Sequence, residues 1–415
     1  MTLPISRIIC WVDQLWNVFG QNPAHLPTGF PMSSPLLIAT AISAALAMGL
    51  VQVLFRILQG PLQQTAHLSE AKLERLQMAL TISWIPLMPL AGWFVDRWGV
   101  YEVLFGGSLL LAMAISWIGL CQNPTGVIWG VLGLGTAGAC VTTAGICLMP
   151  EALTLSSRWS AGASLCLGFV FVGLAALLAP IVIPEILRRA HLPRTALALG
   201  LFCLMPAVFV AMVQMTNAQR QVGGLPTDAP LYDVRFWLVA LVAFLYFSLE
   251  KLLESWPRGY LLEMGYDARD LARLIIGFWL AFLFFRFGLA WLVRPGNEAW
   301  LVLVLSVASS MILGNLVGAD APISGYVGFW LVGASYGPIL PALLAILDLD
   351  GTDRISAQEV GAIFALQSVS QLLVQPLLAR FAKWQSPRAS MRLAMIIGLL
   401  MAAPALVLAL IRFRS

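Results

Sequence analysis

The stretch FWLVALVAFLYFSLEKLLESW, residues 236–256, decides the fold. Crossing the hydrocarbon core of a bilayer takes about 20 mostly apolar helical residues, and this run supplies them. Its last part nevertheless carries Glu250, Lys251 and Glu254. An ionised side chain at the centre of a membrane helix costs about 2.5–3.5 kcal/mol on insertion scales, so such residues usually face a cavity and pair with other charges. The stretch therefore predicts a membrane helix that lines an aqueous space within the protein.

The composition extends this interpretation to the whole chain. Of the 415 residues, 60% are hydrophobic and only 11% are charged, whereas a soluble domain has about 25% charged residues. The net charge of +4 is modest, and no basic cluster interleaved with aromatic residues suggests nucleic-acid binding. The six cysteines form no C-x-x-C pair, and the three histidines lie outside the predicted spans. We therefore expect no disulfide framework, no metal site and no cofactor.

The apolar pattern recurs along the chain and predicts twelve membrane spans. The connectors are short, and several carry turn signals such as QNPTG, RRAHLPR and VRPGNEA. The longest connector separates the first six spans from the last six. We therefore predict an all-α polytopic membrane protein with a six-helix bundle at 34–215, a cytoplasmic linker at 216–233 and a second six-helix bundle at 234–415. The spans are predicted at 34–58, 76–95, 100–120, 126–149, 160–183, 195–215, 234–262, 268–293, 298–318, 322–347, 357–380 and 390–411.

Residues 1–33 have a different pattern. Apolar side chains recur there at helical spacing, from Ile5 to Phe19, which favours an amphipathic helix lying in the membrane interface. A disordered tail is an equally open interpretation. The segment lacks the basic start and continuous apolar core that are typical of a signal peptide.

The two halves share a sequence register. LSEAKLERL (68–76) matches YDARDLARL (266–274) at an offset of 198, and the same offset aligns AGWFVDR (91–97) with LAWLVRP (289–295). Many transporters consist of paired repeats of this kind, with the substrate site near the midplane at the repeat interface. The register therefore predicts two pseudo-symmetric bundles.

The motif GWFVDRWG (92–99) between the second and third spans resembles the signature of the major facilitator superfamily. That signature has a glycine, then aspartate and arginine, then a glycine in the cytoplasmic loop after the second helix. Gly92 and Gly99 would allow a tight turn and close helix approach. The resemblance implies that Asp96 and Arg97 supply salt bridges that hold the cytoplasmic side shut.

Further charged residues are expected to take part in this closure. Glu151 and Arg158 follow the fourth span, in a second family-like element. Arg286 in the eighth span and Glu359 in the eleventh are interpreted as the counterpart of that cluster in the second half. The superfamily also places both termini in the cytoplasm, and we expect the cell (inner) membrane. Lysine and arginine are divided almost evenly between the two sides, so the positive-inside rule does not support this orientation.

A weaker resemblance concerns the branch of fucose-permease-like sugar:proton symporters. It is carried by SLEKLLESWPRGYL, GFWLAFLFFR and GASYGPILPALLA. That branch has carboxylates in helices 1 and 4, whereas here the first span carries Arg56 and the fourth has none before Glu151. The sugar specificity and the proton route of that branch therefore do not transfer to this chain.

The repeat offset predicts a charge site in the central cavity. It places Glu254 opposite Arg56, and Glu250 opposite Gln52. Glu250 and Glu254 are four residues apart and share a helix face, and Lys251 can partly neutralise Glu254. We expect Arg56 and Glu254 to pair across the cavity, which leaves Glu250 to couple transport to protons. A static pair that only fixes helix packing is the alternative.

Other polar and aromatic residues are candidates for substrate contacts. Gln367, Gln371 and Gln375 fall on one face of the eleventh span and could bind hydroxyls or amides; hydrogen bonding between helices is the alternative. Trp256 could stack on a substrate ring or could belong to the aromatic belt at the membrane interface.

The expected function is secondary active transport of a small polar solute, such as a sugar, by alternating access and proton-coupled uptake. Export of amphipathic compounds or lipids is the first alternative, and a non-transporting receptor or scaffold is the second. The sequence contains no nucleophile triad and no phosphate-binding loop that would suggest an enzyme. The expected partners are the small-molecule substrate, protons and the lipid bilayer, with the protein as a monomer.

Overall fold

The computed structural model describes residues 34–153, 160–216, 233–255, 261–262, 265–294, 296–317, 322–347, 355–384 and 387–414. Helices make up almost all of this part of the chain. They are α2 (Ser34–Thr65), α3 (Glu70–Trp98), α4 (Val100–Leu120), α5 (Pro124–Leu153), α6 (Ala161–Thr216), α7 (Val234–Ser255), α9 (Ala268–Leu289), α10 (Glu298–Val317), α11 (Pro322–Tyr336), α12 (Ile339–Ala345), α13 (Ala357–Trp384) and α14 (Pro387–Arg414).

Within the described residues, ten helices are long and apolar enough to cross a membrane. One of them, α6, contains two predicted spans, and α13 corresponds to a further predicted span. The predicted all-α polytopic membrane fold is confirmed, and the chain is an integral membrane protein. The N-terminal segment 1–33 and nearly all of the predicted linker lie outside the described residues.

One predicted turn is confirmed and one predicted span is broken. The turn predicted at RRAHLPR lies at His191, where φ is 59° and ψ is 164°, and this non-helical residue separates the two spans of α6. The tenth span is broken into α11 and α12 at Gly337 and Pro338. Residues 256–260 lie outside the described residues, so the predicted end of the seventh span at residue 262 stays a prediction.

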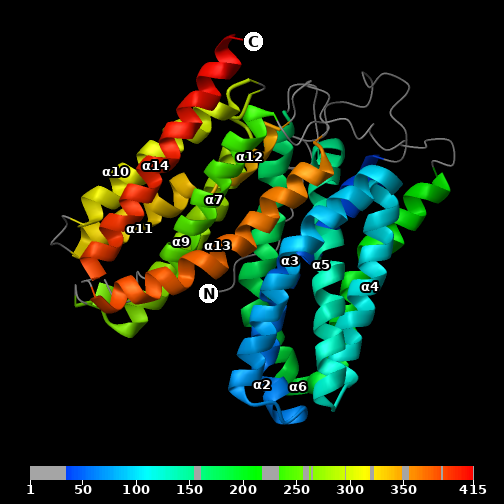
Figure 1. Ribbon diagram of the computed structural model, residues 1–415. Coiled ribbons are helices and arrows are strands. Elements are labelled where there is room, and N and C mark those ends of the chain that lie inside the picture. Colours follow the sequence, from blue (N-terminus) through cyan, green and yellow to red (C-terminus); the bar gives the residue numbers. More distant parts are fainter. Residues whose placement is uncertain are drawn as a thin grey trace, which may run out of the picture.

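The helices pack in two groups. In the first group, α2 packs against α5 and α6, and α4 packs against α5 and α6. In the second, α14 lies against α7 and α10, while α11 lies against α9 and α10. Figure 1 shows the first group in blue to green and the second in green to red.

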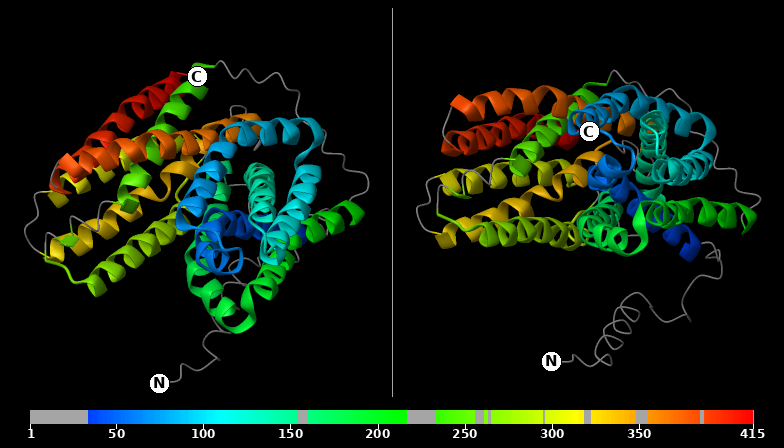
Figure 2. Two further views of the ribbon diagram at one scale, coloured as in Figure 1. Left: turned by 60° about the horizontal axis from the view of Figure 1, so that its bottom comes forward. Right: turned by 90° about the horizontal axis from the view of Figure 1, so that it is seen from below.

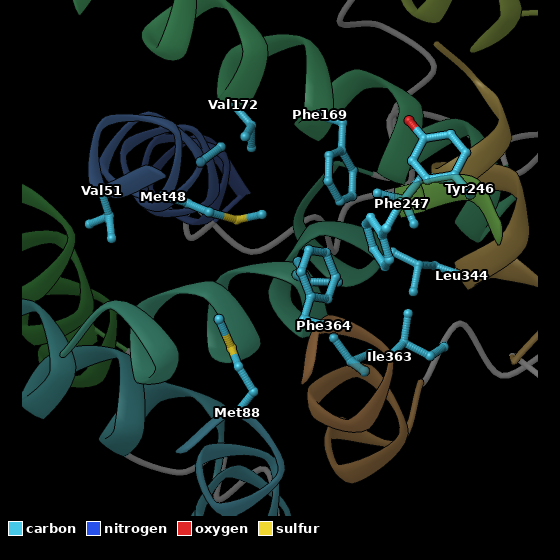
Figure 3. Packing of buried hydrophobic residues seen from close by; sticks show 14 of the residues in the cluster. Met48, Val51, Met88, Phe169, Val172, Tyr246, Phe247, Leu344, Ile363 and Phe364 are labelled. Carbon is cyan, nitrogen blue, oxygen red and sulfur yellow. The ribbon is translucent and has the colours of Figure 1, made fainter. Parts of the chain in front are cut away.

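The two groups meet mainly through four helix pairs, namely α3 with α13, α6 with α9, α6 with α12, and α5 with α13. The contacts described below lie where α3 and α9 end and where α6 and α13 begin, and we call this region the closed end. Figure 1 shows the groups spreading apart from it, and Figure 2 shows α13 (orange) reaching across to α3 (blue). Figure 3 shows buried side chains of both groups in the shared core, among them Met88, Phe169, Phe247 and Phe364.

The close packing of α2 on α6 can be tested with two glycine substitutions on α2. A Cβ on Gly49 would lie 2.0 Å from the carbonyl oxygen of Val172 on α6, whereas one on Gly60 would meet nothing within 4 Å. Gly49→Ala should therefore destabilise the protein by about 1–3 kcal/mol through overpacking. Gly60→Ala should leave stability unchanged or raise it by up to about 1 kcal/mol through helix propensity. Thermal unfolding in detergent measures both, and equal midpoints for the two variants would contradict the packing of α2 on α6.

Candidate functional site

Asp96 joins the two groups at the closed end. It lies in the last turn of α3, and its two carboxylate oxygens accept hydrogen bonds from the backbone N–H groups of Ala357 and Gln358, each at 3.0 Å. The first N–H groups of a helix have no partner within the helix, and the helix dipole favours negative charge there. A carboxylate of the first group thus caps α13 of the second group.

Glycines allow the backbones to approach at this crossing. A Cβ on Gly92 would lie 2.2 Å from the carbonyl oxygen of Ala357, and one on Gly361 would lie 2.3 Å from that of Met88. Gly99 has φ 105° and connects α3 directly to α4, in a conformation that strains any residue with a Cβ. Larger side chains at Gly92 or Gly361 would push α3 and α13 apart.

The sequence predicted a salt bridge for Arg97. Among the described residues, Arg97 forms no salt bridge. Its guanidinium lies over the ring of Trp93 on the same helix, 5.2 Å from the ring centroid. Glu151 is exposed at the end of α5, and Arg158 lies outside the described residues. Two backbone donors and a helix N-terminus stabilise the Asp96 carboxylate and offset part of the cost of its burial.

The second side of the closed end is formed by α6 and α9. The Ser160 hydroxyl donates to the carbonyl oxygen of Val293 at 3.5 Å and also accepts from the backbone N–H of Ala163 at 3.2 Å. Cys166 on α6 is fully buried and packs against Ala290 and Val293. Its thiol is therefore a natural reporter of whether this contact between the groups is closed.

Arg286 is a second polar link between α6 and α9, and it is only 4% exposed. Its Nε donates to the carbonyl oxygen of Gly337 at 2.5 Å, and one Nη donates to that of Phe169 at 3.4 Å. The guanidinium also lies over the rings of Phe282, at 4.0 Å, and Phe169, at 5.3 Å. In a regular helix the Gly337 carbonyl would accept from residue 341, but Pro341 has no N–H. Arg286 satisfies that carbonyl instead.

A small pocket lies beside Arg286. It is lined by Glu250 and Leu253 of α7, by Phe278, Trp279 and Phe282 of α9, and by Tyr336 of α11. Glu250 is half-buried and is the charged residue of this lining. A carboxylate among aromatic walls combines one strong acceptor with flat apolar surfaces, the kind of lining that binds organic molecules. In this state the walls leave no room for a water molecule, so a ligand enters only if they move apart.

Two tyrosines connect the pocket to Arg286. The rings of Tyr246 and Tyr336 stack with centroids 4.3 Å apart, and the Tyr336 hydroxyl donates to the carbonyl oxygen of Tyr246. The Tyr246 hydroxyl is buried and makes no well-aligned hydrogen bond in the described structure, but it lies within loose hydrogen-bonding reach of Arg286. Glu250 and Arg286 each lie within electrostatic range of both tyrosines.

The predicted charge site is divided by the structure. Glu250 faces the aromatic pocket within the second group, and Lys251 is buried at 9% exposure. Gln52 and Arg56 are exposed on α2 of the first group. The Glu254 side chain lies outside the described residues, so its pairing with Arg56 stays a prediction.

The remaining predicted residues have separate surroundings. Gln367 and Gln371 are half-buried on α13, without a hydrogen-bond partner among the described residues, while Trp256 and the side chain of Gln375 lie outside the description. Glu359 is 6% exposed in the first turn of α13, in electrostatic range of Asp96 and Asp233. Arg286 and Glu359 do not form one cluster: the described contacts of Arg286 are with carbonyls and aromatic rings on α6, α9 and the α11–α12 break.

Comparison with known proteins identifies the fold. No family model and no curated protein matches the chain. Among solved structures, the major facilitator superfamily transporter FucP in its outward conformation is 17% identical, with a TM-score of 0.64 over 90% of this chain and 98% of that one. The chain has the major facilitator fold. The human organic anion transporter MFSD10 is 13% identical, with a TM-score of 0.69 over 92% of this chain and 100% of that one.

A third similar structure is the proton:xylose symporter XylE, at 15% identity and a TM-score of 0.67 over 89% of this chain and 94% of that one. The resemblance read from the sequence is thus confirmed at the level of the fold, including its fucose-permease-like part. At these identities the likeness concerns the arrangement of helices. The substrate has to be argued from this chain's own residues.

The capping role of Asp96 can be tested with Cys166 as the reporter. In a variant whose only cysteine is Cys166, Asp96→Ala should raise the rate of maleimide labelling, because opening of the closed end exposes the thiol. Loss of a helix cap costs about 0.5–2 kcal/mol, which corresponds to roughly a 2- to 30-fold higher rate. Asp96→Asn should give a smaller rise, since its amide oxygen can still accept one hydrogen bond.

The matched control is Glu102→Ala, which removes an exposed carboxylate from the adjoining first turn of α4. It should leave the labelling rate unchanged. A labelling rate for Asp96→Ala equal to that of the control would mean that the carboxylate does not hold the closed end.

Proposed function

We propose that the protein is a secondary active transporter that moves a small polar solute across the membrane by alternating access of its two helix groups. The observation that carries the proposal is the position of the pocket. Glu250 and its aromatic neighbours lie next to Arg286, which bonds to both helix groups at the closed end. A ligand in the pocket would therefore sit where separation of the groups has to begin.

The geometry corresponds to one of the two states that alternating access requires. The groups are held together at the closed end by Asp96 on one side and by Ser160 and Arg286 on the other. We infer that this end faces the cytoplasm, in accordance with the position of the GWFVDRWG motif in the superfamily. The pocket would then be approached from the outside.

Glu250 is the residue that we expect to carry the proton. It is a half-buried carboxylate that lines the pocket, so a proton and a solute would bind within one site. A transported solute and a bound proton then influence each other through direct contact, which is the simplest basis for coupling. Two similar solved structures, a fucose:proton symporter and a proton:xylose symporter, support this proposal by analogy.

The pocket lining also favours a second candidate, transport of amphipathic compounds. Phe278, Trp279, Phe282 and Tyr336 supply rings, and Leu253 supplies a further apolar side chain. A sugar would place most of its hydroxyls against these apolar groups, where they would lack hydrogen-bond partners. An amphipathic molecule would instead bury apolar surface against them, which is favourable. Thermal-shift screening of the purified protein against sugars, nucleosides, amino acids and lysolipids separates the two candidates.

Proton coupling is tested in liposomes that contain the purified protein and a trapped pH-sensitive dye. A solute that shifts the melting temperature should drive a change of internal pH with the parent protein. Glu250→Gln should abolish that change while leaving a measurable thermal shift that no longer depends on pH. The amide keeps the size of the side chain but cannot take up a proton.

The control for this experiment is Glu185→Gln. Glu185 is a carboxylate on α6 that pairs with Arg188 and Arg189 at 2.5 and 2.6 Å, outside the pocket lining. This variant should transport as the parent does. If Glu250→Gln retained proton movement as pH-sensitive as that of the parent, the coupling role would belong to another group.

A further inference from the structure

Arg286 has an unusual set of partners for a buried cation. A guanidinium has five N–H donors, and two of them reach carbonyl oxygens, while rings cover its faces. Among the described residues no carboxylate forms an ion pair with it. Taking a charge out of water is expensive unless it is paired and fully hydrogen-bonded. Packing alone would be satisfied at lower cost by an apolar side chain of similar volume.

The contacts of Arg286 lie on parts of the protein that must separate for the closed end to open. Phe169, whose carbonyl and ring it contacts, belongs to α6 of the first group. Gly337 lies at the break between α11 and α12 of the second group. Phe282, whose ring lies nearest to the guanidinium, also lines the pocket. One side chain therefore contacts a pocket wall and the opposite group at the same time.

A second acceptor is available to the guanidinium inside its own group. The Tyr246 hydroxyl is fully buried, makes no well-aligned hydrogen bond in the described structure and lies within loose hydrogen-bonding reach of Arg286. The second group thus already holds two acceptors for the guanidinium, the Gly337 carbonyl and this hydroxyl, whereas Phe169 is its acceptor in the first group.

We propose that Arg286 is a positioning residue that couples ligand binding in the pocket to the contact between α6 and α9. This proposal rests on the proposed function and adds to it the link between binding of the ligand and opening of the closed end. A ligand that displaces the ring of Phe282 removes support from the guanidinium. Arg286 then leaves the Phe169 carbonyl and keeps its partners inside the second group, the Gly337 carbonyl and the Tyr246 hydroxyl. The contact between α6 and α9 loses this polar bridge, and the closed end opens.

The test measures maleimide labelling of Cys166 in the full-length protein with serine at the five other cysteines. Phe282→Leu imitates displacement of the ring and should raise the labelling rate roughly fivefold or more, the range of typical coupling effects. In an Arg286→Met background, labelling should be fast already, and adding Phe282→Leu should change it less than about twofold, since the residue that couples the two sites is absent.

Phe284→Leu is the matched control for the pocket substitution. It is the same change on the same helix, but the Phe284 side chain is 74% exposed and should leave labelling unchanged. Arg286→Lys serves as a second background that keeps the charge and is less prone to misfolding. Its ammonium cannot form the planar fork of a guanidinium, so it should also lose the response to Phe282→Leu.

Two results would overturn the proposal. One is a labelling rate in Phe282→Leu equal to that of the parent. The other is a Phe282→Leu effect of the same size with arginine, lysine or methionine at position 286, which would mean that the pocket and the contact act independently. Labelling requires no transport, so failure of this test leaves the proposed function standing. Absence of solute movement in liposomes would count against the proposed function alone.

Discussion

The capping of α13 by Asp96 is the interaction on which the closed end depends. The carboxylate belongs to one helix group and the two backbone donors to the other. Both donors lack partners within their own helix, and the helix dipole adds positive charge at the same place. The interaction requires two backbones in contact, which is why Gly92 and Gly361 occupy the crossing of α3 and α13. The charge and the glycines therefore act as one unit.

The pocket and the closed end are connected by a few rigid contacts. Glu250 and Phe282 line the pocket, Phe282 covers the guanidinium of Arg286, and Arg286 bonds to Phe169 in the other group. Packed contacts of this kind tend to exist in discrete arrangements, because close-packed interiors do not deform continuously. The helix break at Gly337 belongs to the same arrangement, since Pro341 leaves the carbonyl that Arg286 binds without its usual donor.

The sequence predicted the fold well because membrane spans are a matter of length and hydropathy, and lipid leaves helices as the simplest way to satisfy the backbone. It also identified the motif that contains Gly92 and Asp96. The partner of Asp96 could not be predicted in the same way, because a helix N-terminus of a distant segment carries no signal in the side-chain sequence. The sequence therefore predicted charged side chains as the partners of Asp96, whereas its partners in the structure are backbone N–H groups.

The surroundings of Arg286 illustrate a second limit. A charged residue in an apolar span was interpreted as part of a charge cluster with Glu359, whereas its contacts are with backbone carbonyls and rings. One signal was available: Pro341 lies four residues after Gly337 and predicts an unsatisfied carbonyl there. Which donor satisfies it depends on how α9 packs against the α11–α12 break, and that is a property of the tertiary structure.

The two sides of the closed end are not equivalent, although the repeats are. The offset that relates the halves aligns Asp96 with Arg294, so α9 has a cation where α3 has the carboxylate that caps a helix of the other group. A cation near the N-terminus of α6 would be unfavourable, and Arg294 is exposed, while Ser160 caps α6 from within its own chain segment. On the α6–α9 side, Arg286 is a buried polar link between the groups, made through backbone carbonyls. This side is also the one next to the pocket, which is where a transporter would need its closure to respond to a ligand.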